Sequence, residues 1–263
     1  DHTLENIKKY KEFKTGKIKL VEGANVGVSS SFLEAIRKAP SADFYAFCDQ
    51  DDIWKDGKIE TATKAIQKCS MNNPILWVSN YSVVNNKLDI LVEHAMTKPV
   101  MDNVYALFYN NVPGCVMVFN QALMWQIRKM KIDRIRMHDI LTLNVALITG
   151  KVLFDAAPYV LYRQHENNVL GYGHKKVNLK SWINDKLHLL LFKDSYNISE
   201  YAEKVLEEYG EYIDSTTREN YELIRDYKKT LRNKILLLNK YYTKRGLDRS
   251  SISIRCKILF ELI

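Results

Sequence analysis

The chain has 263 residues, of which 46% are hydrophobic, 11% aromatic and 27% charged, and its formal net charge is +8 at pH 7. This composition supplies enough apolar material for one substantial globular core and excludes collagen-like, disordered and disulfide-scaffold classes. The positive charge fits an anionic partner, such as nucleic acid, an acidic membrane surface or a phosphorylated small molecule, but it is equally typical of a basic surface that only aids solubility.

The cysteines and the ends of the chain say more about its surroundings. Cys48, Cys69, Cys115 and Cys256 lie far apart and form no CxxC pair, so neither a zinc site nor a disulfide framework is expected, and a reducing cytoplasm fits best. Cys48 and Cys115 stand in apolar segments, which predicts that both are buried. No run of about 18 apolar residues suggests a membrane span. The polar start at Asp1 is typical of a helix cap inside a protein, so we expect a fragment.

The hydrophobic pattern then alternates between helical and strand spacing. The first part predicts a charged helix over 3–13, a strand over 18–21, and a turn at 25–29 that leads into a helix through 32–36. Residues 44–48 form an apolar run, which is typical of a strand covered on both sides. The elements expected after it are a helix over 58–69, a strand over 75–78, a turn and strand over 113–120, helices over 123–130 and 140–148, and strands over 152–154 and 158–162.

This alternation predicts an α/β layer fold, and beyond about Lys175 long helical patterns rich in Leu, Tyr, Lys and Glu replace the strands. We therefore expect one unit over 1–174 and a helical C-terminal region over 175–263. Its basic amphipathic stretches, at 182–192, 232–240 and 254–260, can either lie on an anionic bilayer or pack on the rest of the protein or on another subunit. The chain contains no dense Lys/Arg block and no aromatic–basic platform, so a nucleic-acid partner is not expected.

The strongest local signal is the run Asp49-Gln50-Asp51-Asp52, which begins where the apolar strand over 44–48 ends. In open α/β sheets, ligands bind beyond the carboxyl ends of the strands. Neighbouring carboxylates repel each other and therefore favour a bound cation, and oxygen ligands suit Mg²⁺ or Mn²⁺. The alternative is an acidic turn that caps the helix starting at Lys58, although Trp54 is an unusual residue for an ordinary surface loop.

Two further signals follow along the chain. His138-Asp139 precedes an apolar helix, and Asp139 fits either an N-cap or a general base that takes a proton from a hydroxyl. Arg163 and His165 follow the last predicted strand; the first offers a fork for phosphate, and the second is either a metal ligand or a hydrogen-bonded structural residue.

Together these residues resemble the family 2 glycosyltransferases of GT-A fold, and within them the bacterial rhamnosyltransferase-like group. The resemblance rests on the segments 47–54, 113–120, 138–139 and 162–165, the last followed by Asn168 and Gly171. Their order and approximate spacing match from Asp1 to about Gly173. The runs Asp-Gln-Asp-Asp-Ile-Trp and Tyr-Arg-Gln-His are fairly specific, whereas the turn at 25–27 is generic. The fold implied is a Rossmann-like, mostly parallel sheet flanked by helices.

The resemblance also implies a role for each matching residue. Asp139 is expected to be the catalytic base of an inverting reaction, and Mg²⁺ or Mn²⁺ is expected at Asp51 and His165. The residues expected to bind the donor nucleotide or its diphosphate are Asp49, Asp51, Asp52, Asn25, Gly27 and Arg163. Those expected on the acceptor side are Gly114, Cys115, Trp54 and His138.

The activity implied is transfer of a sugar, in this group rhamnose or a related sugar, from a dTDP- or UDP-sugar to a hydroxyl of a cell-surface glycan or lipid-linked acceptor. The location expected is the cytoplasm, at the inner face of the membrane if the C-terminal helices touch lipid, and a homo-oligomer stays open. Family members begin with a strand and a nucleotide-holding segment that this chain lacks before Asp1, so we expect weak donor binding. The alternatives are a non-catalytic scaffold or assembly subunit of polysaccharide synthesis, and a metal-dependent nucleotidyltransferase.

Overall fold

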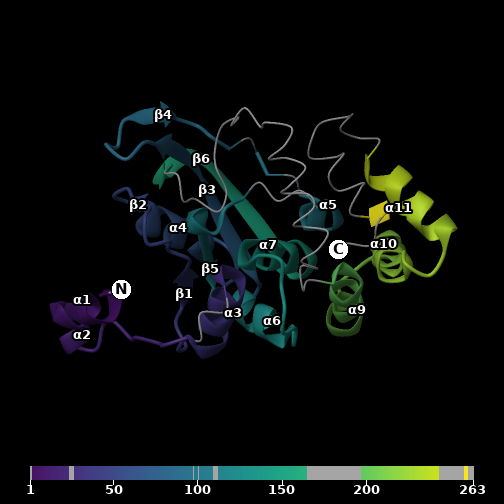
Figure 1. Cartoon of the computed structure of the whole chain (residues 1–263), viewed down its shortest axis with the longest axis horizontal. Coiled ribbons are helices and arrows are strands. Elements are labelled where there is room, and N and C mark those ends of the chain that lie inside the picture. The colour runs from purple at the N-terminus through teal and green to yellow at the C-terminus, as the bar shows by residue number, and fades with distance from the viewer. Residues whose placement is uncertain are drawn as a thin grey trace.

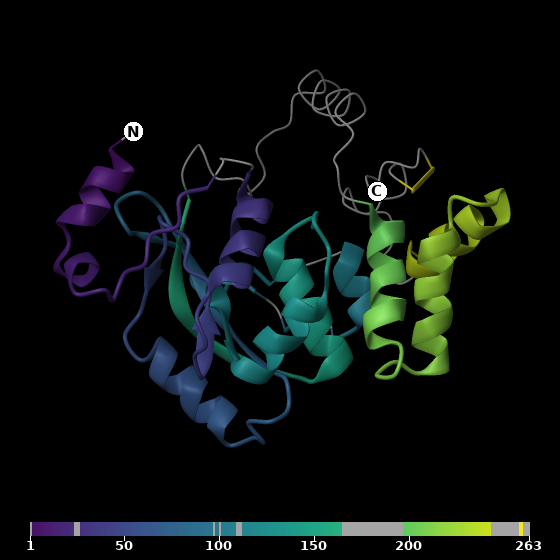
Figure 2. The same ribbon diagram turned by 90° about the horizontal axis from the view of Figure 1, so that it is seen from below.

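A computed structural model describes residues 2–23, 27–96, 98–99, 101–108, 112–164, 197–242 and 258–259. In this part of the chain a six-stranded sheet lies between helices on both of its faces (Figures 1 and 2). The strand order is β1-β5-β3-β6-β2, and β4 pairs with β3. The strands are β1 (Phe44–Ala46), β2 (Ile53–Trp54), β3 (Ile75–Val84), β4 (Ile90–Val92), β5 (Met117–Asn120) and β6 (Lys151–Arg163).

The helices precede, connect and follow these strands. Two short ones, α1 and α2, come first, and three helices, α9 to α11, come last. The described helices are α1 (Thr3–Lys9), α2 (Lys11–Lys14), α3 (Val28–Lys38), α4 (Lys58–Gln67), α5 (Asn103–Phe108), the 3-10 turn η1 (Gly114–Val116), α6 (Gln121–Lys129), α7 (His138–Thr149), α9 (Ile198–Tyr209), α10 (Ser215–Asp226) and α11 (Leu231–Tyr242).

The central strand β3 shows why the sheet carries helices on both faces. Successive side chains of a strand point to opposite faces. Ile75 and Trp77 therefore join an apolar cluster with Ala62 and Ile66 of α4. Leu76 and its neighbours on the other face join the larger cluster, which includes residues of α3, α6 and α7. A strand that is apolar on both faces is thus covered on both, as the continuous apolar runs predict.

The sheet is mixed rather than mostly parallel. The neighbours β3 and β6 run parallel, but β1–β5, β5–β3, β2–β6 and β3–β4 are antiparallel pairs. The expected α/β class with flanking helices is confirmed, whereas the expected parallel majority is wrong because β5 and β2 enter the sheet from the edge at which β1 and β6 end. That edge therefore collects three strand ends, of β1, β3 and β6, and three strand starts, of β5, β2 and β4.

Two segments differ from their sequence-based expectation. Residues 18–21 form no strand, and Ile18 and Val21 are exposed. The strands expected over 152–154 and 158–162 are one strand, β6, whose register shifts opposite Asn80, so that Pro158 lies at an irregularity where a missing N–H is tolerated.

The C-terminal helices share the main core. Tyr201 of α9 donates a hydrogen bond from its hydroxyl to Asn144 Oδ1 (2.7 Å), and Asn144 Nδ2 donates to the hydroxyl of Tyr221 in α10 (2.9 Å). The hydroxyl of Tyr209 donates to the carbonyl oxygen of Gln126 in α6 (2.7 Å). All these side chains are buried. The boundary expected near Lys175 and the helix expected over 182–192 lie outside the described residues.

The N-terminal helices α1 and α2 stand apart from the sheet (Figure 1) and bury none of their residues. In the described part of the chain, no helix combines the length and the apolar character that crossing a membrane requires.

Candidate functional site

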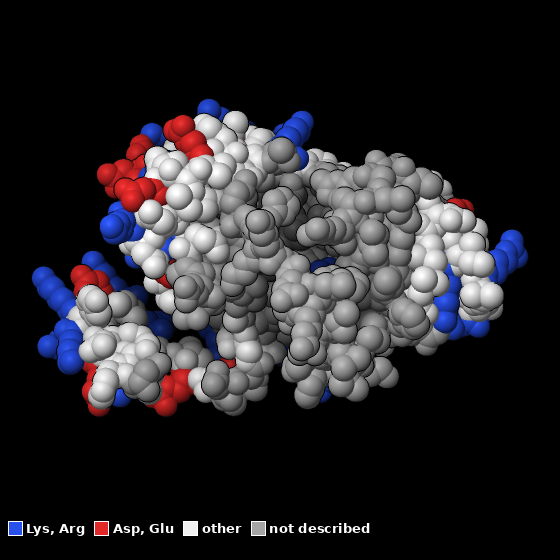
Figure 3. All heavy atoms as spheres, turned by 45° about the horizontal axis from the view of Figure 1, so that its top comes forward, with Lys and Arg blue, Asp and Glu red and all other residues white. Residues whose placement is uncertain are grey.

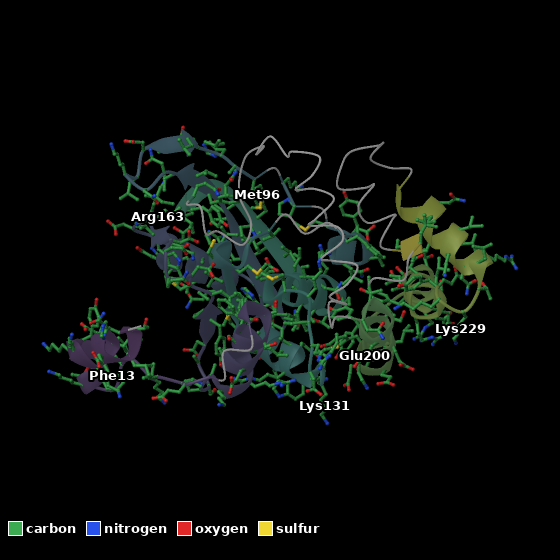
Figure 4. All side chains as sticks on the ribbon, viewed as in Figure 1. Phe13, Met96, Lys131, Arg163, Glu200 and Lys229 are labelled. Atoms are coloured by element: carbon green, nitrogen blue, oxygen red, sulfur yellow. The ribbon has the colours of Figure 1, made fainter. Side chains whose placement is uncertain are left out.

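The edge where β1 and β6 end brings together the first and third sequence signals. The chain leaves β1, passes through the acidic run 49–52 and turns back as β2, whose Ile53 lies opposite Leu161 of β6. The backbone N–H of Arg163 donates to Asp52 Oδ1 (3.1 Å), and its Nε donates to the carbonyl oxygen of Asp51 (3.0 Å). Figure 4 labels Arg163 at this end of the sheet. The acidic loop is therefore fixed by the end of the last strand.

Three side chains of this edge converge. One carboxylate oxygen each from Asp49 and Asp52 and the sulfur of Cys115 all lie within 4.8 Å of one another. Cys115 belongs to η1, the turn through which the chain enters β5, and it is completely buried. Asp52 Oδ2 is buried and has no hydrogen-bond partner among the residues described. We call Asp49, Asp52 and Cys115 the acidic cluster.

The electrostatics of the acidic cluster favour a bound cation. Burial, together with the charges of Asp52 and Asp51, raises the pKa of Asp49 to about 6, and burial also raises the pKa of Asp52. Burial and the neighbouring Asp52 raise the pKa of the Cys115 thiol, so this group stays protonated near neutral pH. A bound cation stabilises the ionised forms of two neighbouring carboxyl groups that otherwise resist ionisation.

The donor set fits a hard divalent cation through its oxygens. Asp49 and the unpartnered Oδ2 of Asp52 are ligands that suit Mg²⁺ or Mn²⁺, whereas a protonated thiol is not one. Asp51, the metal ligand expected from the sequence, is not part of this converging group, and His165 lies outside the described residues. The metal ligands supported by the geometry are therefore Asp49 and Asp52.

Sequence reasoning missed one residue of this edge, Lys58. It is the first residue of α4, and only 1% of its surface is exposed. Its Nζ donates to the carbonyl oxygen of Cys115 (2.5 Å) and lies 3.6 Å from the ring centroid of Trp54. Burial lowers the pKa of Lys58 to about 8, although the nearby acidic groups oppose this shift. A lysine at a helix start usually faces solvent, so the sequence pattern alone carries no signal for its burial.

The acidic run is not the helix cap that the alternative interpretation required. The N-cap of α4 is Gly57, with a φ of 83°, and it makes no side-chain capping hydrogen bond. Similarly, the N-cap of α7 is Met137, so Asp139 lies inside the first turn of that helix. Asp139 is buried, and its Oδ1 accepts a hydrogen bond from the backbone N–H of Ile140 (2.6 Å). Neither acidic signal is thus the N-cap residue itself, although Asp139 accepts from one of the free backbone N–H groups in the first turn of α7.

His138 connects the start of α7 to the acidic cluster. Its ring stacks on Phe32 (3.7 Å between ring centroids) and meets the edge of Phe47 (4.6 Å), and Phe47 stands two residues before Asp49. A Cβ atom at Gly114 would collide with Nε2 of His138, so a side chain at this position would displace the imidazole. Neither ring nitrogen has a hydrogen-bond partner among the described residues, and burial lowers the pKa of His138 to about 4.

The remaining predicted site residues are less closely placed. Asn25 lies outside the described residues. Gly27 is the N-cap of α3 with a φ of 93°, and Ser29 in the first turn donates to the carbonyl oxygen of Arg136, so α3 and α7 begin side by side. The indole Nε1 of Trp54 is buried without a hydrogen-bond partner in the described structure, and its ring faces Lys58.

Comparison with known proteins gives two findings. The family described as glycosyl transferase family 2 matches residues 1–135, a range that includes the acidic cluster and Lys58 but not Asp139 or Arg163. A dTDP-rhamnosyl transferase, RfbG of Shigella flexneri, is 28% identical over 155 residues, which cover 55% of this chain and 52% of that protein. The chain thus spans about half the length of this curated relative.

Proposed function

The chain belongs to glycosyl transferase family 2, and from this premise we propose that it is an inverting, metal-dependent glycosyltransferase of polysaccharide biosynthesis. The donor would be a nucleoside diphosphate sugar. The similarity of the chain to a dTDP-rhamnosyl transferase favours a dTDP-deoxyhexose. The acceptor would be a hydroxyl of a cell-surface glycan or lipid-linked glycan. The observation that carries the proposal is the acidic cluster at the edge where β1 and β6 end, next to the start of α7.

The residues of this edge would have separate roles in such a reaction. Asp49 and Asp52 would hold Mg²⁺ or Mn²⁺, which supplies positive charge against the negative charge that develops on the leaving diphosphate. Arg163, whose Nε donates to the carbonyl oxygen of Asp51 in the acidic loop, would bind the same diphosphate. Asp139 would take the proton from the acceptor hydroxyl, which attacks the anomeric carbon from the face opposite the diphosphate and inverts its configuration.

The base is tested by exchanging the carboxylate for an amide. We expect Asp139→Asn to lower sugar transfer by at least about 100-fold, because the acceptor hydroxyl loses its proton acceptor. Binding of Mn²⁺ and of dTDP should change by no more than about twofold, since Asp139 is assigned no metal or donor contact. Transfer is measured as the nucleoside diphosphate that the protein releases from the donor. Binding is measured by calorimetric titration of dTDP and UDP with and without Mn²⁺.

Asp133→Asn provides the matched control, because Asp133 lies shortly before the same helix and its side chain is 96% exposed. Full transfer activity in Asp139→Asn would remove this residue as the base. Release of pyrophosphate instead of a nucleoside diphosphate would identify a nucleotidyltransferase, and failure to bind any nucleotide would favour a scaffold or assembly role.

The surface of α11 suggests where the protein binds its acceptor. Leu231, Ile235 and Leu236 of α11 are exposed large apolar side chains, and Arg232 and Lys234 stand among them. Figure 3 shows basic side chains over this end of the molecule. A helix that presents apolar and basic side chains together is suited to an anionic bilayer. We infer that α11 touches the inner face of the membrane, where a lipid-linked acceptor would be held.

A further inference from the structure

Lys58 is a buried cation that the reaction outlined above does not use. Its side chain is almost entirely removed from solvent at the start of α4. Removing an ammonium group from water is strongly unfavourable unless other groups compensate. A methionine of similar shape would fill the same space without that penalty. The presence of a charge at this buried position therefore indicates a role other than packing.

The direct partners of the ammonium group are uncharged. They are the carbonyl oxygen of Cys115 (2.5 Å) and the ring of Trp54 (3.6 Å to the centroid). Among the residues that the structure describes, Lys58 makes no ion pair with a carboxylate. Its positive charge is thus held in a fixed place without being cancelled by one bound anion.

The surroundings of that charge are acidic. Lys58 holds the carbonyl of Cys115, whose thiol lies within 4.8 Å of carboxylate oxygens of Asp49 and Asp52. Trp54 is two residues beyond Asp52, so the ring that covers the ammonium group belongs to the acidic loop itself. The side chain of Lys58 therefore links α4, β2 and η1 next to the acidic cluster.

We propose that Lys58 is a positioning residue that also gives the acidic cluster a positive counter-charge, which favours joint binding of a divalent cation and a diphosphate over binding of the cation alone. The inference rests on the function proposed above. With Lys58 present, the site is one charge unit more positive at every state of occupancy. Its field opposes an incoming cation and attracts an incoming diphosphate, and both effects are enlarged by the low dielectric of the surroundings.

Three variants separate charge from shape. Lys58→Gln removes the charge and keeps an N–H donor for the Cys115 carbonyl, while Lys58→Met removes both. Lys64→Met is the matched control, because Lys64 lies on the same helix with 68% of its side chain exposed. The measurements are made at pH 7, which lies between the pKa of Asp49 at about 6 and that of Lys58 at about 8.

The readouts are calorimetric titrations of Mn²⁺ alone and of dTDP at saturating Mn²⁺. In Lys58→Gln and Lys58→Met we expect Mn²⁺ to bind about 3- to 10-fold more tightly and dTDP about 10-fold more weakly. In a transfer assay the loss should appear mainly as a higher KM for the donor. Lys64→Met should match the unaltered protein in all three readouts.

A residue with a merely structural role gives a different pattern. If both ligands bind more weakly in the two Lys58 variants, or if Lys58→Gln behaves like the unaltered protein, the counter-charge is refuted while the metal site stands. If Lys58→Met does not fold, Lys58→Gln alone decides between these results. If the unaltered protein fails to bind Mn²⁺, the proposed metal site fails, and the inference on Lys58 fails with it.

Discussion

At the scale of single residues, His138 is the clearest case of a side chain whose burial sets its chemistry. Both ring nitrogens lack hydrogen-bond partners among the described residues, and the ring is enclosed by Phe32, Phe47 and Gly114. The folded protein therefore holds His138 neutral, with a pKa of about 4. An unfolded chain would protonate the same histidine near pH 6.5.

This difference predicts a loss of stability in mild acid. Below about pH 6.5 the unfolded state binds a proton that the native state refuses, so the free energy of unfolding falls as the pH drops toward 4. Between pH 7 and pH 5 the contribution of His138 is about 2 kcal/mol. Between pH 7 and pH 5 we expect the free energy of unfolding of His138→Leu to fall by about 2 kcal/mol less than that of the unaltered protein. Urea unfolding at both pH values measures the difference.

His94→Leu is the control, since His94 is exposed. Asp49 acts in the opposite direction, because its raised pKa lets the native state take up a proton below about pH 6, but this contribution is common to all three proteins. An equal acid sensitivity in His138→Leu and in the unaltered protein would contradict the assignment.

The residues of the site differ in how far the sequence revealed them. Asp49, Asp52 and Arg163 could be found because they follow apolar strands, and strand ends are where ligands bind. Lys58 could not, because a lysine at a helix start gives no sign of burial. Cys48 was expected to be buried, but it is exposed, since β1 ends at Ala46 and the chain turns outward before it.

At the scale of secondary structure, Asn120 ties three elements together. Its Oδ1 accepts hydrogen bonds from the backbone N–H of Ile75 (3.0 Å) at the start of β3 and of Leu123 (3.1 Å) in α6, for which it is the N-cap. Its Nδ2 donates to the carbonyl oxygens of Met71 and Asn73 in the preceding turn. Asn120 lies at the end of β5 far from Gly114, so its role is structural.

We predict that Asn120→Ala lowers the free energy of unfolding by about 2–4 kcal/mol, because it removes a helix cap and leaves several buried groups unpaired. Asn72→Ala should change it by less than about 0.5 kcal/mol, because Asn72 lies exposed in the same turn. Urea unfolding at pH 7 compares the two. A loss in Asn120→Ala no larger than that in Asn72→Ala would show that the turn and the cap are held by other contacts.

Elements with a clear apolar pattern were predictable, and three short elements without one were not. The helices α3, α4 and α6 match their apolar periodicity, because each buries one face, and the apolar segment over 140–148 is the largely buried helix α7. The short elements β2, β4 and α5 were missed, since two to six residues carry no measurable period. Residues 18–21 have strand-like composition but pair with no strand in the part of the chain that the structure describes.

At the scale of the whole molecule, the face of α11 gives a testable contact. Leu231 is 70% exposed and Ile235 is 47% exposed, in a segment with basic neighbours. We predict that the protein cosediments with vesicles that contain about one third anionic lipid, that added salt weakens this binding, and that Leu231→Asp with Ile235→Asp weakens it about tenfold. Lys229, labelled in Figure 4, is one of the basic side chains beside this face.

The control for the membrane contact is Ile59→Asp, which places a charge at an exposed apolar position of α4. Equal vesicle binding by this control and by the α11 double variant would show that the loss is not specific to α11. Absence of binding to anionic vesicles by the unaltered protein would remove the membrane from the proposal.

The overall architecture was only partly open to sequence reasoning. Alternating helices and strands indicated an α/β fold and a helical C-terminal region, as observed. The direction of β5 and β2 and the packing of α9 to α11 were not predictable, because an amphipathic face shows that a helix is covered without identifying the surface that covers it.

The tyrosine contacts of α9 and α10 limit how this protein can be recombined with its relatives. The hydroxyls of Tyr201, Tyr209 and Tyr221 meet groups of α6 and α7 inside the common core. A chimera joined near residue 175, with C-terminal helices from another enzyme, would leave Asn144 and Gln126 facing foreign side chains. An exchange of the C-terminal helices between relatives must therefore include α6 and α7, because these helices share one core.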